Sequence, residues 1–179
     1  GMPGVWAHIG TRGGLFAEAP GQKAFDDTHP PVSDVRWFQA PKKSRGAAWS
    51  GPNLDSRGLG QVLTVSVPWF NDSGQVDGVA AMDVSVSWVA EKLAPPSGAE
   101  GAWVLDSRGR AVAWSGMNSQ AKPELQRLPF PQHADKIRND RAGWSEAPDG
   151  TIAVWSPLRS LGYTYVVISD PAHLTRDRR

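Results

Sequence analysis

Apolar and polar residues alternate most clearly along VLTVSVPWF, residues 62–70, and this alternation predicts a β-strand. Residues 79–88, VAAMDVSVSW, alternate more loosely, and the intervening NDSGQVDG is rich in residues that favour chain reversal. We therefore predict a hairpin from Val62 to Trp88. The alternation gives the first strand one side with Val62, Thr64, Ser66 and Pro68 and another with Leu63, Val65 and Val67. We expect the aliphatic side to face the core.

Asp83 interrupts the apolar pattern of the second strand. A charge buried without a partner is costly, so this carboxylate should be solvated, paired or turned towards a polar cavity. The residues alone leave two interpretations open. One is a structural ion pair with Arg36 or Lys92, and the other is contact with a ligand.

The rest of the chain is typical of short strands joined by turns, with few helices. Residues 36–40 are predicted to form one helical turn or a bend, 42–46 a basic loop, and Ser85 or Trp88 to Leu93 a helix stopped by Pro95 and Pro96. The other predicted strands are 5–9, 15–19, 102–106, 110–114, 143–145, 151–156 and 163–169. The last of these is largely aliphatic and is expected to be central in its sheet.

Similar features occur in the same order in both halves of the chain. A hairpin around glycine is followed by Trp-Ser, by a strand ending in Ser-x-Pro or Ser-Pro, and by a last strand ending near Ser. This weak repeat predicts an α+β protein of two similar modules, each a central antiparallel sheet with few flanking helices. We place the modules at residues 1–94 and 95–179.

The composition limits the classes of function. A net charge of +1 gives no reason to expect nucleic acid as a partner, and the absence of cysteine excludes disulfides and thiolate metal sites. No motif for a metal or a cofactor is present. No run approaches the roughly 18 apolar residues of a membrane-spanning helix. Nine tryptophans stand out, most of them beside turns or strand ends, where an indole can cap a core or line a pocket.

Several segments, taken in order, resemble a double Cache (PDC) sensor domain. They are GTRGGLFAEAPG, DVRWFQA, AAWSGPNLD, TVSVPWFNDSGQVDGVAAMDVSVSWVAEKL, GAWVLDSRGRAVAWS and GYTYVVISDP. The resemblance implies two PAS-like modules, of which the membrane-distal one usually holds a small ligand. It also implies the extracytoplasmic, periplasmic part of an inner-membrane receptor such as a chemoreceptor, histidine kinase, cyclic-dinucleotide enzyme or phosphatase.

The amino-acid-binding pattern of that family is partly kept. Trp37 matches its tryptophan and Phe38 its tyrosine without the hydroxyl, while Asn53 takes the place of a second tyrosine. Asp55 and Asp83 match the two acids that hold the ligand's ammonium group. The arginine for the ligand's carboxylate is expected at Val35, and Arg36 stands one place out of register.

The residue chemistry points the same way. Carboxylates and indoles that converge on one pocket make a site for a small organic cation, through charge-assisted hydrogen bonds and cation–π contacts. Asp83 is our first candidate, with Asp55, Trp37 and Trp49 beside it. Asp55 could instead bond to its own turn, and Trp49 could cap a core. If the bend turns Arg36 inwards, the ligand would be a carboxylate or an amino acid.

Two other classes of function are compatible with parts of the sequence. An enzyme would have to use Asp55 and Asp83 as an acid and base pair, since the common hydrolase and phosphate-binding motifs are missing. A carbohydrate-binding module would need several indoles on one open face. We expect a non-catalytic sensor without a cofactor that binds a small amine or amino acid in residues 1–94. A homodimer of the receptor is possible, and we expect contact with a membrane only through segments outside this chain.

Overall fold

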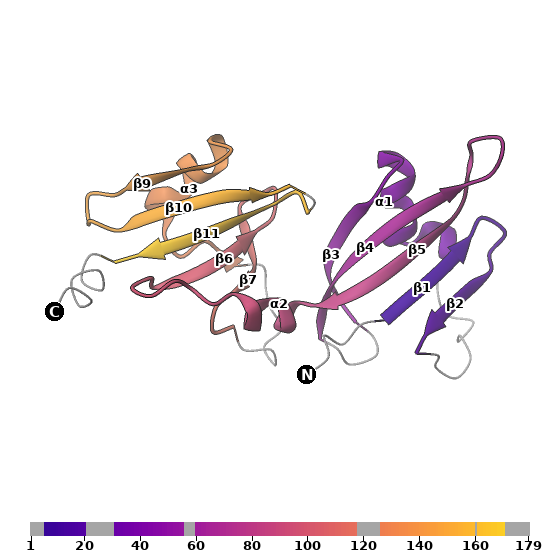
Figure 1. Ribbon diagram of the computed structural model, residues 1–179, viewed down its shortest axis with the longest axis horizontal. Helices are drawn as coiled ribbons and strands as arrows, with labels where there is room; N and C mark the ends of the chain where they lie inside the picture. Colours follow the sequence, from indigo (N-terminus) through magenta and orange to yellow (C-terminus); the bar gives the residue numbers. More distant parts are fainter. Residues whose placement is uncertain (1–5, 21–30, 56–59, 118–125, 160, 171–179) are drawn as a thin grey trace. The chain divides into compact units, whose positions relative to one another are not determined.

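The computed structural model, shown as a ribbon in Figure 1, describes residues 6–20, 31–55, 60–117, 126–159 and 161–170. The chain divides into two compact units, residues 1–85 and 86–179. Each unit contains one antiparallel sheet with few helices, which confirms the predicted α+β class.

The first unit has a five-stranded sheet in the order β2-β1-β5-β4-β3. Its strands are β1 (Trp6–Thr11), β2 (Phe16–Ala19), β3 (Ala48–Leu54), β4 (Gln61–Phe70) and β5 (Val76–Ser85). The predicted central hairpin is confirmed as β4 and β5. Its turn is closed by the Asn71 side chain, which accepts a hydrogen bond from the Gln75 backbone N–H at 2.9 Å, and by Gly74 at φ 71°.

The first unit also contains the 3₁₀ helix η1 (Val32–Asp34) and the helix α1 (Arg36–Ser44). The basic loop predicted from residue 42 is wrong, because Lys42 and Lys43 form the last turn of α1. Lysines at this end of a helix interact favourably with its dipole, and Lys42 also lies over the Phe38 ring, with Nζ 5.3 Å from the ring centroid. Arg45, in the left-handed region at φ 55°, ends the helix.

The sheet face that packs against these helices is the polar one. A side chain at Gly10 of β1 would clash with Val32 of η1 and touch Trp37 of α1, so both helices lie on the face to which Gly10 belongs. Thr64 and Asp83 are buried, with exposed fractions of 3% and 4%, whereas Val67 is 49% exposed. The expectation that the aliphatic side of the first strand faces the core is therefore wrong. We name the buried face the polar face, and its polar side chains include His8, Thr64, Ser66, Asp83 and Ser85.

The second unit has a six-stranded sheet in the order β8-β7-β6-β11-β10-β9. Its elements are α2 (Val86–Lys92), β6 (Gly101–Leu105), β7 (Arg110–Trp114), β8 (Gln126–Arg127), α3 (Pro131–Asn139), β9 (Gly143–Glu146), β10 (Ile152–Leu158) and β11 (Tyr163–Ser169). The interior position predicted for the last strand is confirmed. The structure groups α2 with this unit, while the module limit at residue 94 stays a prediction.

The buried face of the second sheet is apolar. Trp155 is 2% exposed and Val166 and Ile168 are completely buried, and α3 contributes Ile137 to the same core. The Trp155 indole N–H donates to the Asp140 carbonyl at 3.0 Å, which satisfies its only polar atom. The rest of this core consists of Leu105, Ala111, Leu128 and Ala153, with Trp103, Trp114 and Phe130 packed against it.

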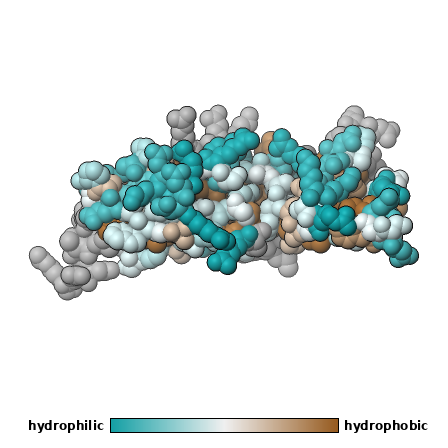
Figure 2. Space-filling view, turned by 90° about the horizontal axis from the view of Figure 1, so that it is seen from above, coloured by the Kyte–Doolittle hydropathy of each residue, from teal (hydrophilic) through white to brown (hydrophobic). Residues whose placement is uncertain are grey.

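Hydrophilic residues cover much of the surface visible in Figure 2, and hydrophobic residues show in smaller areas between them. Within the described residues, no helix has the length and apolar character needed to cross a membrane.

Candidate functional site

Asp83 lies on the polar face, on the central strand β5 and two residues before the end of that strand. Cross-strand register pairs it with Thr64 on β4 and with Trp6 on β1. The Thr64 hydroxyl donates a hydrogen bond to Asp83 Oδ1 at 2.6 Å. The carboxylate is thus held by a neutral donor, and the sequence-predicted site residue is buried in unit 1 rather than solvated.

His8 is a titratable residue that lies beside the Asp83 carboxylate. Its ring is 5% exposed, and Nε2 lies 3.9 Å from Asp83 Oδ1. On the other side His8 pairs with Glu18 of β2 in the antiparallel register, so the two side chains are neighbours on one face. Glu18 is half-buried. A histidine therefore stands between two carboxylates on the polar face.

Four rings gather over this end of the sheet, and we name them the ring cluster: His8, Phe16, Trp37 and Phe38. The Trp37 and His8 ring centroids are 4.7 Å apart, and Trp37 lies 6.3 Å from Phe16 and 5.9 Å from Phe38. Trp37 is half-buried and Phe38 is 1% exposed. Helix α1 brings Trp37 to this cluster because Gly10 leaves room for its indole on β1.

A bulge in β3 decides which side of the sheet its residues face. Ser50 pairs with Thr64, but the register then shifts, and Asn53 pairs with Val62. Because Val62 and Thr64 lie on the same side of β4, Asn53 joins Ser50 on the polar face. Asp55, two residues on, is 8% exposed, whereas Leu54 between them is 71% exposed. The structure therefore places Asn53, Asp55 and Asp83 on one face.

Two candidate residues lie elsewhere. Trp49 pairs with Val65, which pairs with Met82, so its indole belongs to the opposite face from Asp83. Arg36 is the first residue of α1 and is exposed. The structure brings neither residue to Asp83.

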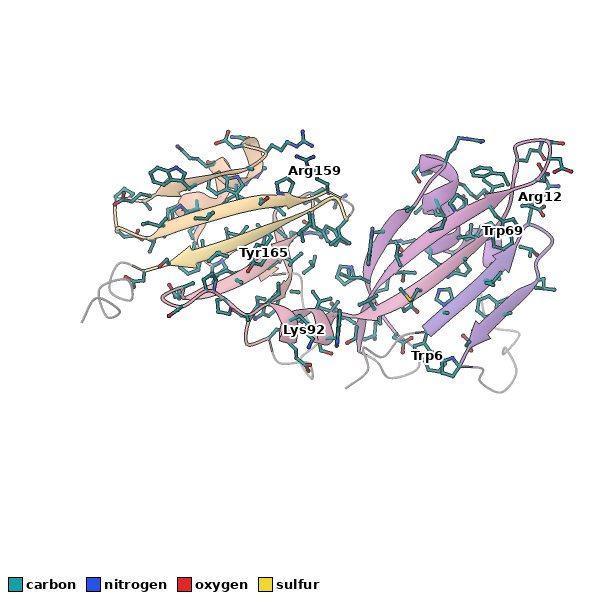
Figure 3. All side chains as sticks on the ribbon, in the orientation of Figure 1. Trp6, Arg12, Trp69, Lys92, Arg159 and Tyr165 are labelled. Atoms are coloured by element: carbon teal, nitrogen blue, oxygen red, sulfur yellow. The ribbon has the colours of Figure 1, made fainter. Side chains whose placement is uncertain are left out.

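Sequence reasoning missed Thr64, His8, Glu18 and Phe16. The hairpin register alone could have identified Thr64, since the turn fixes the pairing of β4 with β5. His8, Glu18 and Phe16 depend on β1 pairing with β5, a contact between segments about 70 residues apart that no local pattern predicts. In Figure 3, Trp6, which pairs with Asp83, lies at the start of β1, and Arg12 lies just beyond the other end of β1.

The second unit contains a buried polar network of a different kind. His133 of α3 is 1% exposed, and its two ring nitrogens bond to the hydroxyls of Ser145 at 2.8 Å and Thr151 at 2.9 Å. Thr151 donates to the Asp149 carboxylate at 2.7 Å. Burial lowers the pKa of His133, and the charge of Asp149 opposes this only in part. Both nitrogens are satisfied, so the network ties α3 to β9 and offers no group for a ligand.

A metal is not favoured by the donor set. In the described parts of both units, no group of three or more His, Asp or Glu side chains could hold a metal ion. What the polar face can do chemically is to bind a cation, because it combines buried carboxylates with aromatic rings.

Residues 17–91 match the family model described as methyl-accepting chemotaxis protein-like, first PDC sensor domain. The match includes β2 to β5, α1 and most of α2.

The solved structures give the fold of the whole chain. The ligand-binding domain of the Pseudomonas fluorescens chemoreceptor CtaA in complex with L-alanine is similar with a TM-score of 0.69 and 17% identity, over 95% of this chain and 74% of that one. The ligand-binding domain of Pseudomonas aeruginosa PAO1 PctB in complex with L-Arg has a TM-score of 0.69 and 19% identity, over 96% and 73%. The chain has the fold of a double Cache (PDC) sensor domain.

A third similar structure comes from another kind of receptor. The extracellular domain of the putative histidine kinase mmHK1S-Z3 has a TM-score of 0.61 and 16% identity, over 81% of this chain and 58% of that one. A search of curated proteins found no match. The double Cache resemblance inferred from the sequence is confirmed.

Proposed function

We propose that the chain is the extracytoplasmic sensor domain of a bacterial receptor and that its first unit binds the ammonium group of a small amine or amino acid. The observation that carries this proposal is Asp83, a carboxylate 4% exposed on a polar sheet face. Burying a carboxylate is costly, which favours a role in binding for Asp83 over a purely structural one.

Asp83 supplies the negative end of the proposed site. Thr64 fixes the carboxylate by donating to Oδ1, which leaves the side chain pre-organised to accept further hydrogen bonds from an ammonium group. Asn53 and Asp55 share this face and belong to the same proposed site. Glu18, next to His8, adds a third carboxylate, which is half-buried.

The ring cluster supplies the apolar wall. Trp37, with Phe16 and Phe38 beside it, can cover the carbon atoms of a ligand and contribute about 0.5–2 kcal/mol per ring that faces the cation. Similar domains were solved in complex with L-alanine and with L-Arg, which supports a small ligand that carries an ammonium group.

An anionic ligand and a sugar are less well supported. Arg36 is exposed at the start of α1 and would have to move to reach a ligand carboxylate, so an amine fits better than an amino acid. A sugar-binding face needs several open indoles. All nine tryptophans lie in the described residues, and of these Trp144 alone is largely exposed, at 67%.

The test is a thermal-shift screen of the purified chain with amines such as ethylamine, amino acids such as L-alanine, and small carboxylates. A ligand at 100 times its Kd adds about 2.7 kcal/mol of stability, which a melting curve resolves. We expect an amine or amino acid to raise the Tm of the parent chain and to have no effect on Asp83→Asn.

Asp77→Asn is the matched control, because Asp77 is on the same strand but exposed. It should keep the ligand response. A response limited to carboxylates would contradict the ammonium site and favour a role for Arg36. No response to any compound would contradict the sensor proposal itself.

A further inference from the structure

His8 is buried on strand β1, whose sequence is WAHIGT. Its ring packs against Trp37 with a centroid separation of 4.7 Å. Its Nε2 atom points at the carboxylate that the proposed site uses for the ligand's ammonium group, 3.9 Å from Asp83 Oδ1. A neutral imidazole at this distance leaves Asp83 Oδ1 to Thr64, whereas an imidazolium forms an ion pair with it.

The described groups that surround His8 are carboxylates, aromatic rings and a hydroxyl. Two carboxylates face it in the described structure: Asp83 from β5 and Glu18 from β2. From helix α1, the Trp37 indole packs against His8, and it has no titratable group. On β4, the residue paired with Asp83 is Thr64, whose hydroxyl does not titrate either. Histidine is the side chain whose ordinary pKa, near 6.5, lies within the physiological pH range. Protonation of His8 would add one positive charge beside Asp83.

We propose that His8 is a specificity-determining residue of the ligand site, which acts by competing with the ligand's ammonium group for Asp83 when it is protonated. The inference rests on the proposed function. The neutral ring admits a cationic ligand and forms part of its aromatic wall, while the imidazolium replaces the ligand's charge at the carboxylate and repels it. The site is therefore a sensor for cations that works at neutral and alkaline pH and closes in acid.

The sign and size of the effect follow from proton linkage. Ligand binding displaces one proton, so affinity is constant above the midpoint of the His8 titration and falls below it by at most about tenfold per pH unit. We expect about a tenfold weaker affinity for ethylamine and for L-alanine at pH 5.5 than at pH 7.5. Both compounds keep their ammonium charge over this range, so the ligand itself contributes no change.

The first experiment needs no ligand. The ring protons of His8 are followed by NMR from pH 4.5 to 8.5 in the parent chain and in Asp83→Asn. Loss of the carboxylate should move the midpoint of the His8 titration to lower pH, while the midpoint of His133, in the other unit, stays unchanged. Identical midpoints for His8 in the two chains would overturn the proposal.

The second experiment measures Kd for ethylamine and L-alanine by calorimetry at pH 5.5, 6.5 and 7.5. His8→Gln, which keeps a similar size without a proton to gain, should bind at pH 7.5 and lose the pH dependence. His133→Gln, the same change at the buried histidine of the second unit, should keep it. His8→Asn serves as a second variant if His8→Gln does not fold.

The outcomes separate this proposal from the one it rests on. Binding with the same Kd at all three pH values in the parent chain would overturn the role of His8 and leave the ligand site intact. Absence of binding at every pH would contradict the ligand site. A pH dependence that survives in His8→Gln would assign the proton to another residue and overturn the proposal.

Discussion

The buried faces of the two sheets differ in polarity. The face buried in the first sheet mixes polar residues with apolar ones such as Val62 and Val79, and the face buried in the second sheet is mainly apolar. In the first unit, α1 and η1 cover a face with Thr64 and Asp83, and aliphatic residues such as Val67 are left on the other side. In the second unit the covered face carries Trp155, Val166 and Ile168. The same position in the fold thus holds a mainly apolar core in the second unit and a buried carboxylate among polar side chains in the first.

The largest change in stability is expected from a substitution in the apolar core of the second unit. Trp155→Ala should lower the free energy of unfolding of the second unit by about 3–5 kcal/mol, because it removes a fully buried indole and leaves a cavity. Hydrogen exchange of β10 and β11 during denaturant titration measures it. Trp144→Ala, at a 67% exposed position on the neighbouring strand, should change stability by less than about 0.5 kcal/mol. Equal losses for the two variants would show that this face is not the core.

A smaller loss of stability is expected when the hydrogen-bonded pair of Thr64 and Asp83 in the first unit is made apolar. Asp83→Leu alone leaves the Thr64 hydroxyl without its acceptor and should cost about 1–3 kcal/mol. The double variant Thr64→Val with Asp83→Leu should recover most of this loss, since replacing both partners by apolar groups is close to neutral. Urea unfolding compares the three chains, and the ligand response should be absent from both variants. A double variant less stable than the single one would mean that the polar face is there for stability.

The smallest effect concerns the pH dependence of the second unit. Burial lowers the pKa of His133 below its ordinary value of 6.5, so the unfolded chain takes up this proton more readily than the folded one. The stability contributed by the neutral ring is complete above about pH 6.5 and decreases as the pH falls below it. Unfolding curves between pH 5 and 8 should show this slope in the parent chain and a smaller one in His133→Gln. An unchanged slope would exclude His133 as its source.

Local patterns were sufficient for most of the strands and for one candidate site residue. The alternation along residues 62–70 and the Asn- and Gly-containing turn specify the β4–β5 hairpin, because strand period and turn chemistry are properties of adjacent residues. Asp83 could be recognised as a site residue for the same reason, since it breaks an apolar strand. The places of Asn53 and Asp55 in the site stay predictions, although the bulge in β3 puts both on its face.

Which face of the first sheet is buried was decided by the tertiary structure. Alternation divides β4 into two sides without saying which one a helix will cover, and the hydrophobic side was the wrong choice. Gly10 settles it, because only a residue without a side chain allows η1 and α1 to approach β1 so closely. That packing, together with the pairing of β1 with β5, brings His8, Glu18 and Trp37 to Asp83 from segments distant in sequence. The sequence by itself determined most of the strands and singled out Asp83. Long-range packing decided which face is buried and which side chains surround that carboxylate.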